Sequence, residues 1–398
     1  MVSHDLSWLL RRGVAEVIVE SELLKLLESG KPLRLKQGFD PSCPDIHLGH
    51  VVGLRKLSQF QKLGHRVVLI VGDWTAQIGD PSGVSMTRSM LSAEEVRTNA
   101  QTYMGQFFKV VDKDKTEVRW QSEWFGEFGL EDIIKLTSKF TVAQFLARED
   151  FANRYNAGRP IAITELLYPL LQAYDSVAIR ADVEFGGTDQ KFNCLVGREL
   201  QQMMGQRPQQ VFLMPLLIGT DGSQKMSKSL GNYISVDEPP NEIYGKVMSI
   251  PDSLIIDYLE LVTDVPDKEI ADFKEQMAHQ TVNPMVIKKR LAQEIVTQFQ
   301  GAQAARDSEE HFAKVFQRGE VPEEVVTLKT SIENKNTLTA ELTEAGLTKS
   351  RSEARRLLAQ GAIEIDGKPI TEDLEITKIK KGSIIKVGKR RFAQIAGK

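Results

Sequence analysis

Cysteine is scarce in this sequence, and long apolar runs are missing from it. Of 398 residues only Cys43 and Cys194 are cysteines, and they lack CxxC or Cys/His spacing, so neither a disulfide framework nor a zinc site is expected. No apolar run approaches the roughly 20 residues that cross a bilayer. The N-terminal MVSHDLSWLLRRG carries a carboxylate and two arginines where a signal peptide is apolar. A protein of the reducing cytoplasm, without a membrane partner, is therefore expected.

The charge is divided unevenly along the chain. The net charge is -3, but residues 346–398 hold 13 Lys and Arg against 6 Asp and Glu, which leaves 38 against 48 for the rest. A basic module therefore follows an acidic body, and a nucleic-acid partner is not excluded. A length of 398 residues predicts two or three domains.

The first half of the chain has the pattern of a parallel α/β sheet. Residues 32–40 predict a strand and turn, residues 48–63 an amphipathic helix, and residues 66–72 a nearly all-apolar strand, followed by a turn at 79–83. This is a βαβ unit, which favours an open, Rossmann-like sheet. Further helices are expected at 164–179 and 191–204, and a strand at 210–214.

Four segments are expected along the chain. A Rossmann-like catalytic domain covers residues 1–235, with a connective insertion at about 115–165. A helical domain follows at 236–320, with helices at 253–262, 267–278, 284–300 and 302–317. Residues 321–338 have the polar composition of a linker. The last domain, residues 339–398, is small and α+β.

Two short motifs carry residues suited to nucleotide chemistry. His47 and His50 of HLGH stand three residues apart where a strand and turn give way to a helix, so both imidazoles lie at a helix N-terminus, and Gly49 leaves room for a phosphate or base. The same histidines could simply cap the helix. Lys225 and Lys228 of KMSKS lie in a loop flanked by glycines, where two ammonium groups could close over a polyphosphate or remain solvated. The two motifs together are far more specific than either alone.

With these motifs, the sequence resembles the class I aminoacyl-tRNA synthetases, and in particular the shorter bacterial branch of the tyrosyl enzymes. The stretches GFDPSCPDIHLGH, IGDPSG, YPLLQAYD, FGGTDQ and QKMSKSLGNYI follow in that family's order over nearly the whole chain. The resemblance implies a tyrosine–tRNA ligase with ATP and Mg²⁺, tRNA(Tyr) as partner, a homodimer, a helical anticodon-binding domain, and neither zinc nor an organic cofactor.

The resemblance also implies a role for particular residues. For tyrosine, Asp175 would accept the phenolic O–H, with Lys36 near that end, Tyr168, Gln172 and Asp80 around the α-ammonium, and Gln190 near the carboxylate. For ATP, it implies Gly38, Asp40, Gly49, Gly187, Asp189 and Lys228. The transition state would be stabilised by Ser42, His47, His50, Arg88, Lys225 and Lys228. A pocket that hydrogen-bonds a hydroxyl rejects phenylalanine strongly, because Asp175 would be left unpaired. An ordinary polar stripe on a helix would have the same spacing.

Two positions depart from the longer branch of that family. Lys36 stands where that branch has tyrosine, and the sequence leaves open whether its ammonium group reaches the phenolic oxygen or pairs with a carboxylate. Val84 stands where that branch has lysine, which leaves Arg88 and the KMSKS lysines to contact phosphate.

The C-terminal segment resembles an S4-type RNA-binding domain. Lys349, Arg351, Arg355 and Arg356 gather on one predicted helix, and the spacing of Arg351 and Arg355 keeps both on one face. Such a surface suits RNA phosphates, although a solvated basic helix would look the same. The following GAIEIDGKPI predicts a β-hairpin.

Three other functions share parts of this pattern. Another HxGH nucleotidyltransferase would not need the RNA-binding module. A tryptophanyl relative fits YxxxQxxD and GGTDQ less well. A non-catalytic RNA-binding scaffold would not need both motifs intact.

Overall fold

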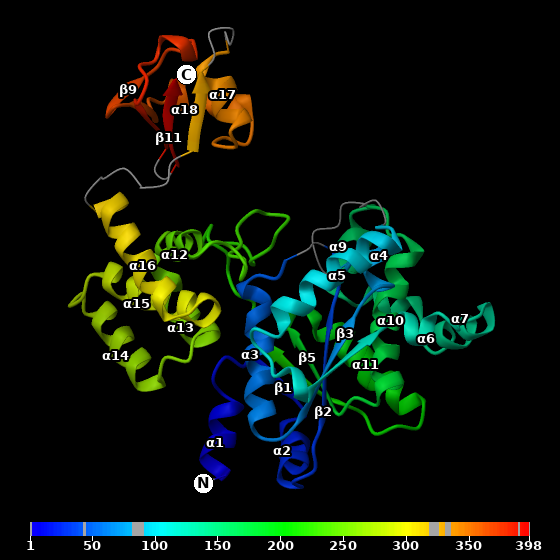
Figure 1. The fold of residues 1–398 in the computed structure, drawn as a ribbon. Helices are drawn as coiled ribbons and strands as arrows, with labels where there is room; N and C mark the ends of the chain where they lie inside the picture. The colour runs from blue at the N-terminus through cyan, green and yellow to red at the C-terminus, as the bar shows by residue number, and fades with distance from the viewer. Residues whose placement is uncertain are drawn as a thin grey trace. The chain divides into compact units, whose positions relative to one another are not determined.

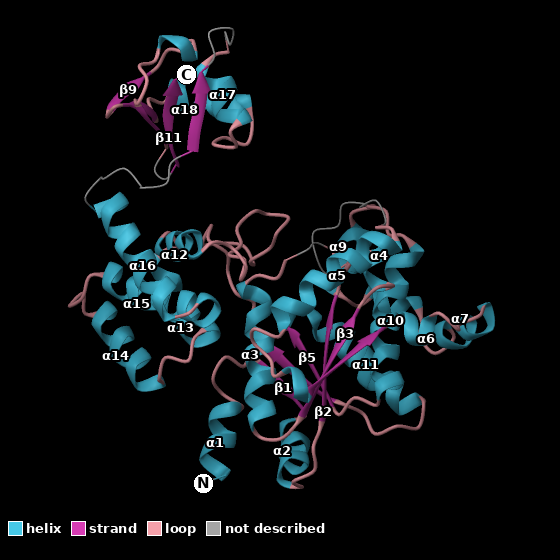
Figure 2. Ribbon diagram, viewed as in Figure 1, coloured by secondary structure: helices cyan, strands magenta, loops and turns pink. Residues whose placement is uncertain are grey.

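A six-stranded sheet lies at the centre of the first part of the chain (Figures 1 and 2). The structure is a computed structural model that describes residues 2–42, 45–81, 91–317, 326–330, 336–388 and 391–397. In spatial order the strands are β1 (Glu16–Ile18), β6 (Gln210–Met214), β5 (Val183–Gly187), β2 (Arg34–Phe39), β3 (Arg66–Val71) and β4 (Thr116–Trp120). Only β1 runs antiparallel to its neighbour, and the other pairings are parallel.

From the two central strands, β2 and β5, the next strand of the chain is added on opposite sides. Helix α3 (Leu48–Lys62) connects β2 to β3 on one side, and α11 (Lys191–Met203) connects β5 to β6 on the other. Right-handed crossovers that run in opposite directions place their helices on opposite faces of a sheet. The order therefore reverses between the adjacent strands β2 and β5. In open α/β sheets this is where ligands bind. The Rossmann-like sheet expected from the sequence is confirmed.

Other helices surround this sheet. They are α1 (Val2–Leu9), α2 (Glu20–Glu28), α4 (Thr75–Ile78), α5 (Ala93–Phe107), α6 (Ser122–Phe125), α7 (Leu130–Thr137), α8 (Val142–Leu146), α9 (Glu149–Asn156) and α10 (Ile163–Ile179). Apolar side chains of α7 to α11 share one core cluster, which includes Leu136, Phe145, Phe151 and Leu170. The elements of the expected connective insertion thus pack against α10, the helix that carries YPLLQAYD.

A group of helices follows the sheet. It consists of α12 (Pro240–Met248), α13 (Ile255–Val262), α14 (Asp267–Ala278), α15 (Pro284–Gln300) and α16 (Ala302–Phe312), which continues as a π turn over Ala313–Gln317. Arg12 joins the N-terminal segment to this group, because its guanidinium donates to the carbonyl oxygens of Leu259 and Thr263 at the end of α13. The chain divides into two compact units, Met1–Ala305 and Arg306–Lys398. The domain limits expected from the sequence remain predictions.

Beyond α16 and its π turn, the described residues of the second unit form a five-stranded sheet, two α-helices and one 3-10 turn. The strand order is β7 (Val326–Thr330), β11 (Arg391–Gly397), β10 (Ile384–Val387), β8 (Ile363–Ile365) and β9 (Lys368–Ile370), and the helices are α17 (Leu338–Glu344) and α18 (Arg351–Ala359). The predicted hairpin is confirmed as β8 and β9, joined through Asp366 and Gly367, both with positive φ. Strand β7 pairs in parallel with β11, so part of the stretch expected to be a linker belongs to the sheet.

Among the described residues, no helix is long and apolar enough to cross a membrane.

Candidate active site

The residues proposed from the sequence gather at the carboxyl ends of β2 and β5. Gly38 lies near the end of β2 and Asp40 follows that strand, whereas Gly187 ends β5 and leads into a 3-10 turn that holds Asp189 and Gln190. A Cβ atom on Gly187 would lie 2.7 Å from Leu216 and 2.8 Å from the Asp189 carboxylate. A Cβ atom on Gly38 would have no neighbouring atom within 4 Å. The backbone at β5 is therefore tightly packed, and the end of β2 is open.

The two histidines of HLGH form the N-terminal cap of α3, and their rings lie next to one another. His47 is the N-cap of α3, and its Nδ1 accepts a hydrogen bond from the Gly49 backbone at 3.2 Å. The Nδ1 of His50 accepts from the His47 backbone N–H at 3.2 Å, and the two ring centroids are 4.0 Å apart. A Cβ atom on Gly49 would lie 2.9 Å from the His47 ring. Glycine is thus required here because the imidazole folds back over it.

Both imidazoles are neutral donors at ordinary pH. Removal from water lowers the pKa of His50 to about 3 and the pKa of His47 well below its usual 6.5, and the ammonium of Lys228 adds to both effects. Because Nδ1 of each ring accepts a backbone N–H, the single proton of each neutral ring belongs on Nε2. Each histidine can therefore offer one Nε2–H to a phosphate oxygen without adding a charge.

The two lysines of KMSKS are already engaged. The Nζ of Lys225 lies 2.7 Å from Oδ2 of Asp189, and the Nζ of Lys228 lies 5.4 Å from the ring centroid of Tyr103 on α5. Asn232 holds the loop, because its Oδ1 accepts from the backbone of Ser227 and its Nδ2 donates to Asp221. The motif is therefore an ordered loop whose positive charges face the end of β5 and α5.

Asp175 is the buried carboxylate of α10, with only 2% of its surface exposed. Its Oδ2 accepts from the side-chain amide of Gln121 at 2.9 Å and its Oδ1 from the indole of Trp124 at 3.2 Å. Burial raises the pKa of Asp175 to about 7, and the nearby ammonium of Lys36 opposes that rise. Two neutral donors thus fix the direction of an acceptor in a low-dielectric site.

Tyr168 and Asp40 form a second cluster next to Asp175. The Tyr168 hydroxyl donates to Oδ2 of Asp40 at 2.8 Å, and the Thr75 hydroxyl donates to its Oδ1 at 2.7 Å. Desolvation raises the pKa of Asp40 to about 7, although both hydrogen bonds oppose this. A Cβ atom on Gly72, directly after β3, would collide with Asp40 and Thr75. The cluster therefore needs glycine at that position.

The remaining predicted tyrosine-site residues lie in two groups. The amide of Gln190 donates to Oδ2 of Asp80 at 2.7 Å. The amide of Gln172 instead donates to Oε1 of Glu184 at 3.1 Å, and the Lys36 ammonium also lies 2.9 Å from that oxygen. The question left open by the sequence is answered for this structure, in which Lys36 pairs with a carboxylate.

Ser42 is exposed, and its backbone N–H donates to the carbonyl oxygen of Asp40 at 2.7 Å. It lines a hollow of about 480 Å³ together with side chains at the start of α5, namely Leu91, Ser92, Glu94, Glu95, Thr98 and Asn99. Arg88 and Val84 lie outside the described residues. No group of three or more His, Cys, Asp or Glu side chains among the described residues could hold a metal ion.

Sequence reasoning missed several residues that build the site. They are Gly72, Thr75, Tyr103, Gln121, Trp124, Glu184 and Asn232. Asn232 lies in the quoted stretch QKMSKSLGNYI, so its position was available as a signal. Gln121 follows β4, a strand that the sequence pattern did not predict, so nothing local marked it.

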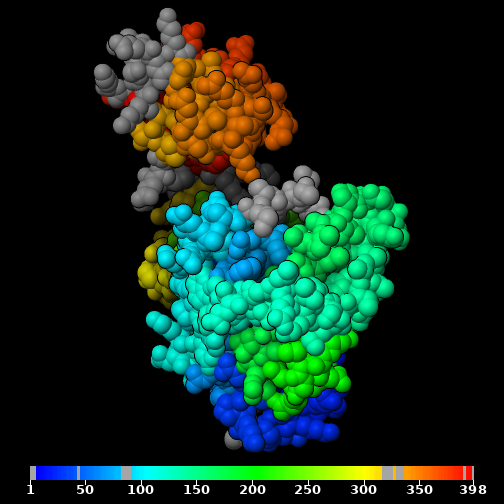
Figure 3. All heavy atoms as spheres, turned by 90° about the vertical axis from the view of Figure 1, so that its right-hand side faces the viewer, coloured from blue at the N-terminus to red at the C-terminus, as the bar shows by residue number. Residues whose placement is uncertain are grey.

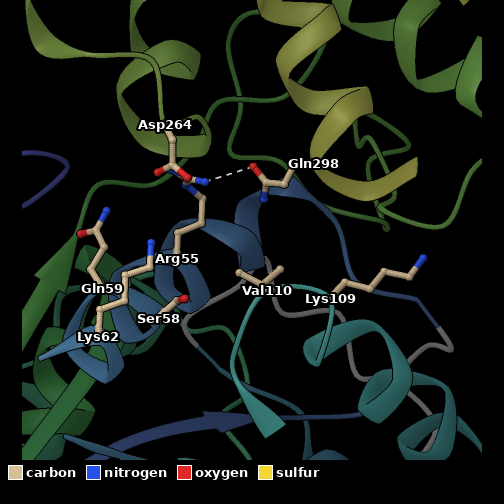
Figure 4. Close-up of a pocket in the computed structure, with 8 residues that line it drawn as sticks. All are labelled: Arg55, Ser58, Gln59, Lys62, Lys109, Val110, Asp264 and Gln298. Carbon is tan, nitrogen blue, oxygen red and sulfur yellow. Dashed lines mark hydrogen bonds and ion pairs between the residues drawn. The ribbon is translucent and has the colours of Figure 1, made fainter. Parts of the chain in front are cut away.

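A separate hollow of about 210 Å³ lies between α3 and the helices that follow the sheet (Figure 4). The guanidinium of Arg55 crosses it, with one contact to Asp264 at 2.5 Å and one to Gln298 at 3.0 Å. The other lining residues are Ser58, Gln59, Lys62, Lys109 and Val110. None of the site residues proposed from the sequence lines this hollow.

The four basic residues proposed for RNA binding are together on the second unit. Arg351, Arg355 and Arg356 are exposed on α18, and Lys349 is exposed just before its N-cap, Ser350. Ala354 and Leu358 are buried on the adjoining side of the helix. The amphipathic pattern therefore turns all four cations towards solvent.

Comparison with known proteins gives the family. Residues 28–317 match the model of tRNA synthetases class I (W and Y), and residues 340–377 match the S4 domain. The chain is similar to a tyrosine–tRNA ligase of Dehalococcoides mccartyi, with 64% identity over 98% of each chain, and to one of Thermotoga maritima, with 52% identity over 98% of this chain and 96% of that one. The chain belongs to the tyrosine–tRNA ligase family of class I synthetases.

Solved structures share the fold of this synthetase. Tyrosyl-tRNA synthetase of Archaeoglobus fulgidus, complexed with L-tyrosine, matches with a TM-score of 0.62 at 24% identity, over 77% of this chain and 99% of that one. The mitochondrial enzyme of Aspergillus nidulans, truncated at its C-terminus, matches with a TM-score of 0.66 at 21% identity, over 78% and 94%. The class I synthetase fold with a C-terminal S4 domain, expected from the sequence, is confirmed.

Proposed function

We propose that the site between β2, β5 and α10 activates L-tyrosine with ATP and transfers it to tRNA(Tyr). The observation that carries this proposal is Asp175, a buried carboxylate held by two neutral donors on the helix that also carries Tyr168 and Gln172. Each oxygen of this buried carboxylate can accept a second hydrogen bond, and a substrate that brings a hydroxyl is selected because it fills that capacity in a site removed from water.

In this proposal tyrosine lies with its phenolic O–H on Asp175. Its α-ammonium faces Asp80, Tyr168 and Gln172, and Gln190 lies near its carboxylate. An oxygen of that carboxylate attacks the α-phosphorus of ATP, the bond to the bridging oxygen breaks, and pyrophosphate leaves. A ribose hydroxyl of the tRNA then displaces AMP from the tyrosyl-adenylate. Catalysis is mainly positioning and stabilisation of charge.

The ATP would occupy the ends of β2 and β5. Gly38 leaves the end of β2 open to the nucleotide, the backbone at Gly49 and Gly187 would lie beside it, and Asp40 and Asp189 offer acceptors for its hydroxyls. Ser42, His47, His50, Arg88, Lys225 and Lys228 would contact the phosphates in the transition state. Mg²⁺ would arrive with ATP, since it prefers phosphate oxygens and keeps several of its waters. ATP and tRNA meet in the cytoplasm, where we propose that the enzyme acts.

The tRNA would contact the helical segment and the S4 domain. We propose the helices of 236–320 for the anticodon region and Lys349, Arg351, Arg355 and Arg356 for RNA phosphates. The exposed position of these four cations supports this role.

We also propose a homodimer formed through the connective insertion. Large apolar side chains are exposed on α7 to α10, namely Leu130, Ile134, Val142, Tyr155 and Ile163. Ile163 is 80% exposed and Leu130 76%. Figure 3 looks onto the side of this unit where these elements form the surface. Apolar groups on one side of a protein favour association with a second copy.

Sedimentation equilibrium should give twice the chain mass, and Ile134→Lys with Ile163→Glu should give monomers. A monomeric wild type would refute the proposed dimer.

The proposed reaction is tested by amino-acid-dependent ATP–pyrophosphate exchange with tyrosine, phenylalanine and tryptophan. Exchange with tyrosine alone, lost in Asp175→Ala, is the expected result. Exchange with tryptophan alone would assign the site to the other amino acid of this family. Silence with all three would favour a non-catalytic RNA-binding scaffold.

A further inference from the structure

Lys36 lies beneath the tyrosine site with no exposed surface, on β2 and facing α10. Its ammonium group has three acceptors within hydrogen-bond distance: the carbonyl oxygen of Gln172 at 2.7 Å, the hydroxyl of Ser176 at 2.7 Å, and Oε1 of Glu184 at 2.9 Å. A lysine has three N–H donors. All three are therefore used within the protein, and none is left for a substrate oxygen in this arrangement.

Two of these acceptors belong to the turn of α10 that carries Asp175. Gln172 precedes Asp175 by three residues and Ser176 follows it directly, so the ammonium ties this turn to the sheet. The third acceptor, Glu184 on β5, is 1% exposed and also accepts from the side chains of Gln172, Ser176 and Gln209. A single buried network thus links β2, β5, α10 and Gln209, the residue before β6.

The network also sets the charge around Asp175. Glu184 and Asp175 are two buried carboxylates in one region, and Lys36 is the cation that acts on Asp175. The titratable groups that face this cluster are Asp175 and Tyr168 on α10, Lys36 on β2, Glu184 on β5 and Cys194 on α11. The pKa of Cys194 and that of Tyr168 are raised well above their usual values by burial, so both stay neutral. The segment after β4 contributes only the neutral Gln121 and Trp124.

We propose that Lys36 is a positioning residue for tyrosine recognition, which acts through Glu184 and the α10 turn that carries Asp175 and does not touch the substrate. The inference rests on the proposed function, because it takes Asp175 as the acceptor for the phenolic O–H. A positioning role for Lys36 differs in one testable way from direct contact between Lys36 and the substrate. If Lys36 acts through Glu184, the effect of removing one must depend on the presence of the other.

The test is a double-mutant cycle with Lys36→Met, Glu184→Gln and the double variant, in tyrosine-dependent ATP–pyrophosphate exchange. Lys36→Met should lower kcat/KM for tyrosine by about 10- to 100-fold through KM, and leave KM for ATP unchanged. The double variant should recover part of this loss, because it no longer buries a carboxylate that has lost its countercharge. The matched control is Lys56→Met, which removes a second buried lysine that donates only to the carbonyls of Leu9 and Arg12. It should leave KM for tyrosine unchanged.

The pH profile of kcat/KM for tyrosine gives a readout that a merely structural role would not move. A nearby cation favours the ionised form of Asp175 and a nearby carboxylate disfavours it. The acid limb should therefore move to higher pH in Lys36→Met, to lower pH in Glu184→Gln, and lie between them in the double variant. If Lys36→Met does not fold, the double variant is compared with Glu184→Gln, and its acid limb should lie at higher pH.

Three results would overturn the inference. They are an unchanged tyrosine KM and pH profile in Lys36→Met, a double variant no better than Lys36→Met, and equal profiles for the double variant and Glu184→Gln. The second result would assign Lys36 to direct contact with the phenolic oxygen. The wild type distinguishes the role of Lys36 from the proposed function. If the wild type does not catalyse tyrosine-dependent exchange, the proposed function itself is refuted.

Discussion

The ammonium of Lys225 lies 2.7 Å from the carboxylate of Asp189, the residue proposed for the ribose of ATP. Nucleotide binding must therefore compete with an ion pair that already closes the KMSKS loop onto the end of β5. The pair is partly exposed, with 39% and 21% of the two side chains accessible, so it adds little to stability.

We predict that Lys225→Ala slows formation of tyrosyl-adenylate by about 100-fold, because a cation near the departing pyrophosphate is lost. Tyrosine binding should be unchanged, and the free energy of unfolding should change by less than about 1 kcal/mol. Single-turnover adenylation and thermal denaturation measure these quantities. Lys386→Ala, which removes a lysine 3.3 Å from Glu364 in the second unit, should alter neither. A loss confined to tyrosine affinity would contradict the assigned role.

Asp40 should make the fold less stable as pH rises. Its folded-state pKa is about 7 against a usual 3.8, so between these values the folded chain keeps a proton that the unfolded chain has released. The folded state therefore loses stability as pH rises towards 7 and carries the full cost above it. The free energy of unfolding of Asp40→Asn minus that of wild type should rise by roughly 1–3 kcal/mol between pH 5 and pH 8. Urea denaturation at each pH measures this difference, and a constant difference would count against a raised pKa. Exchange activity should fall in the same variant.

Local patterns in the sequence were sufficient for the elements that hold the motifs. The apolar spacing after HLGH predicts a helix at 48–63, and α3 covers Leu48–Lys62. The run RVVLIVG predicts the buried strand β3. These features depend on neighbouring residues in the chain, so periodicity alone reveals them.

Features that depend on distant partners could not be predicted. Strand β4, TEVRW, is half-buried at the edge of the sheet and has no apolar run. Strand β7 is polar and exists because it pairs with β11, more than 60 residues later in the chain. Lys36 and Glu184 are 148 residues apart, so only the fold shows that they meet. The site was thus predictable where motifs are local, and its supporting network was not.

His50 should show the opposite pH dependence from Asp40. Its folded-state pKa is about 3, below the usual 6.5, so only the unfolded chain gains a proton as pH falls. The stability that His50 contributes is therefore complete above pH 6.5 and decreases below it. The free energy of unfolding of wild type minus that of His50→Asn should fall by ~1–2 kcal/mol from pH 7.5 to pH 5. In NMR spectra the imidazole resonances of His47 and His50 should not titrate between pH 5 and pH 8, whereas in urea they should. Titration in the folded protein would show that the rings are charged.

Gly49 offers a direct test of how HLGH is built. A Cβ atom there would lie 2.9 Å from the His47 ring, so Gly49→Ala must displace the imidazole that caps α3. The exchange rate should fall by about 10- to 100-fold, because a misplaced donor no longer meets the phosphate. The control is Gly105→Ala on α5, where nothing lies within 4 Å of the new methyl group. That variant should keep full activity and gain roughly 0.5–1 kcal/mol of stability, since alanine favours a helix interior. If Gly49→Ala also kept full activity, the imidazole of His47 would have no part in adenylation, because the substitution leaves it no room in its present position.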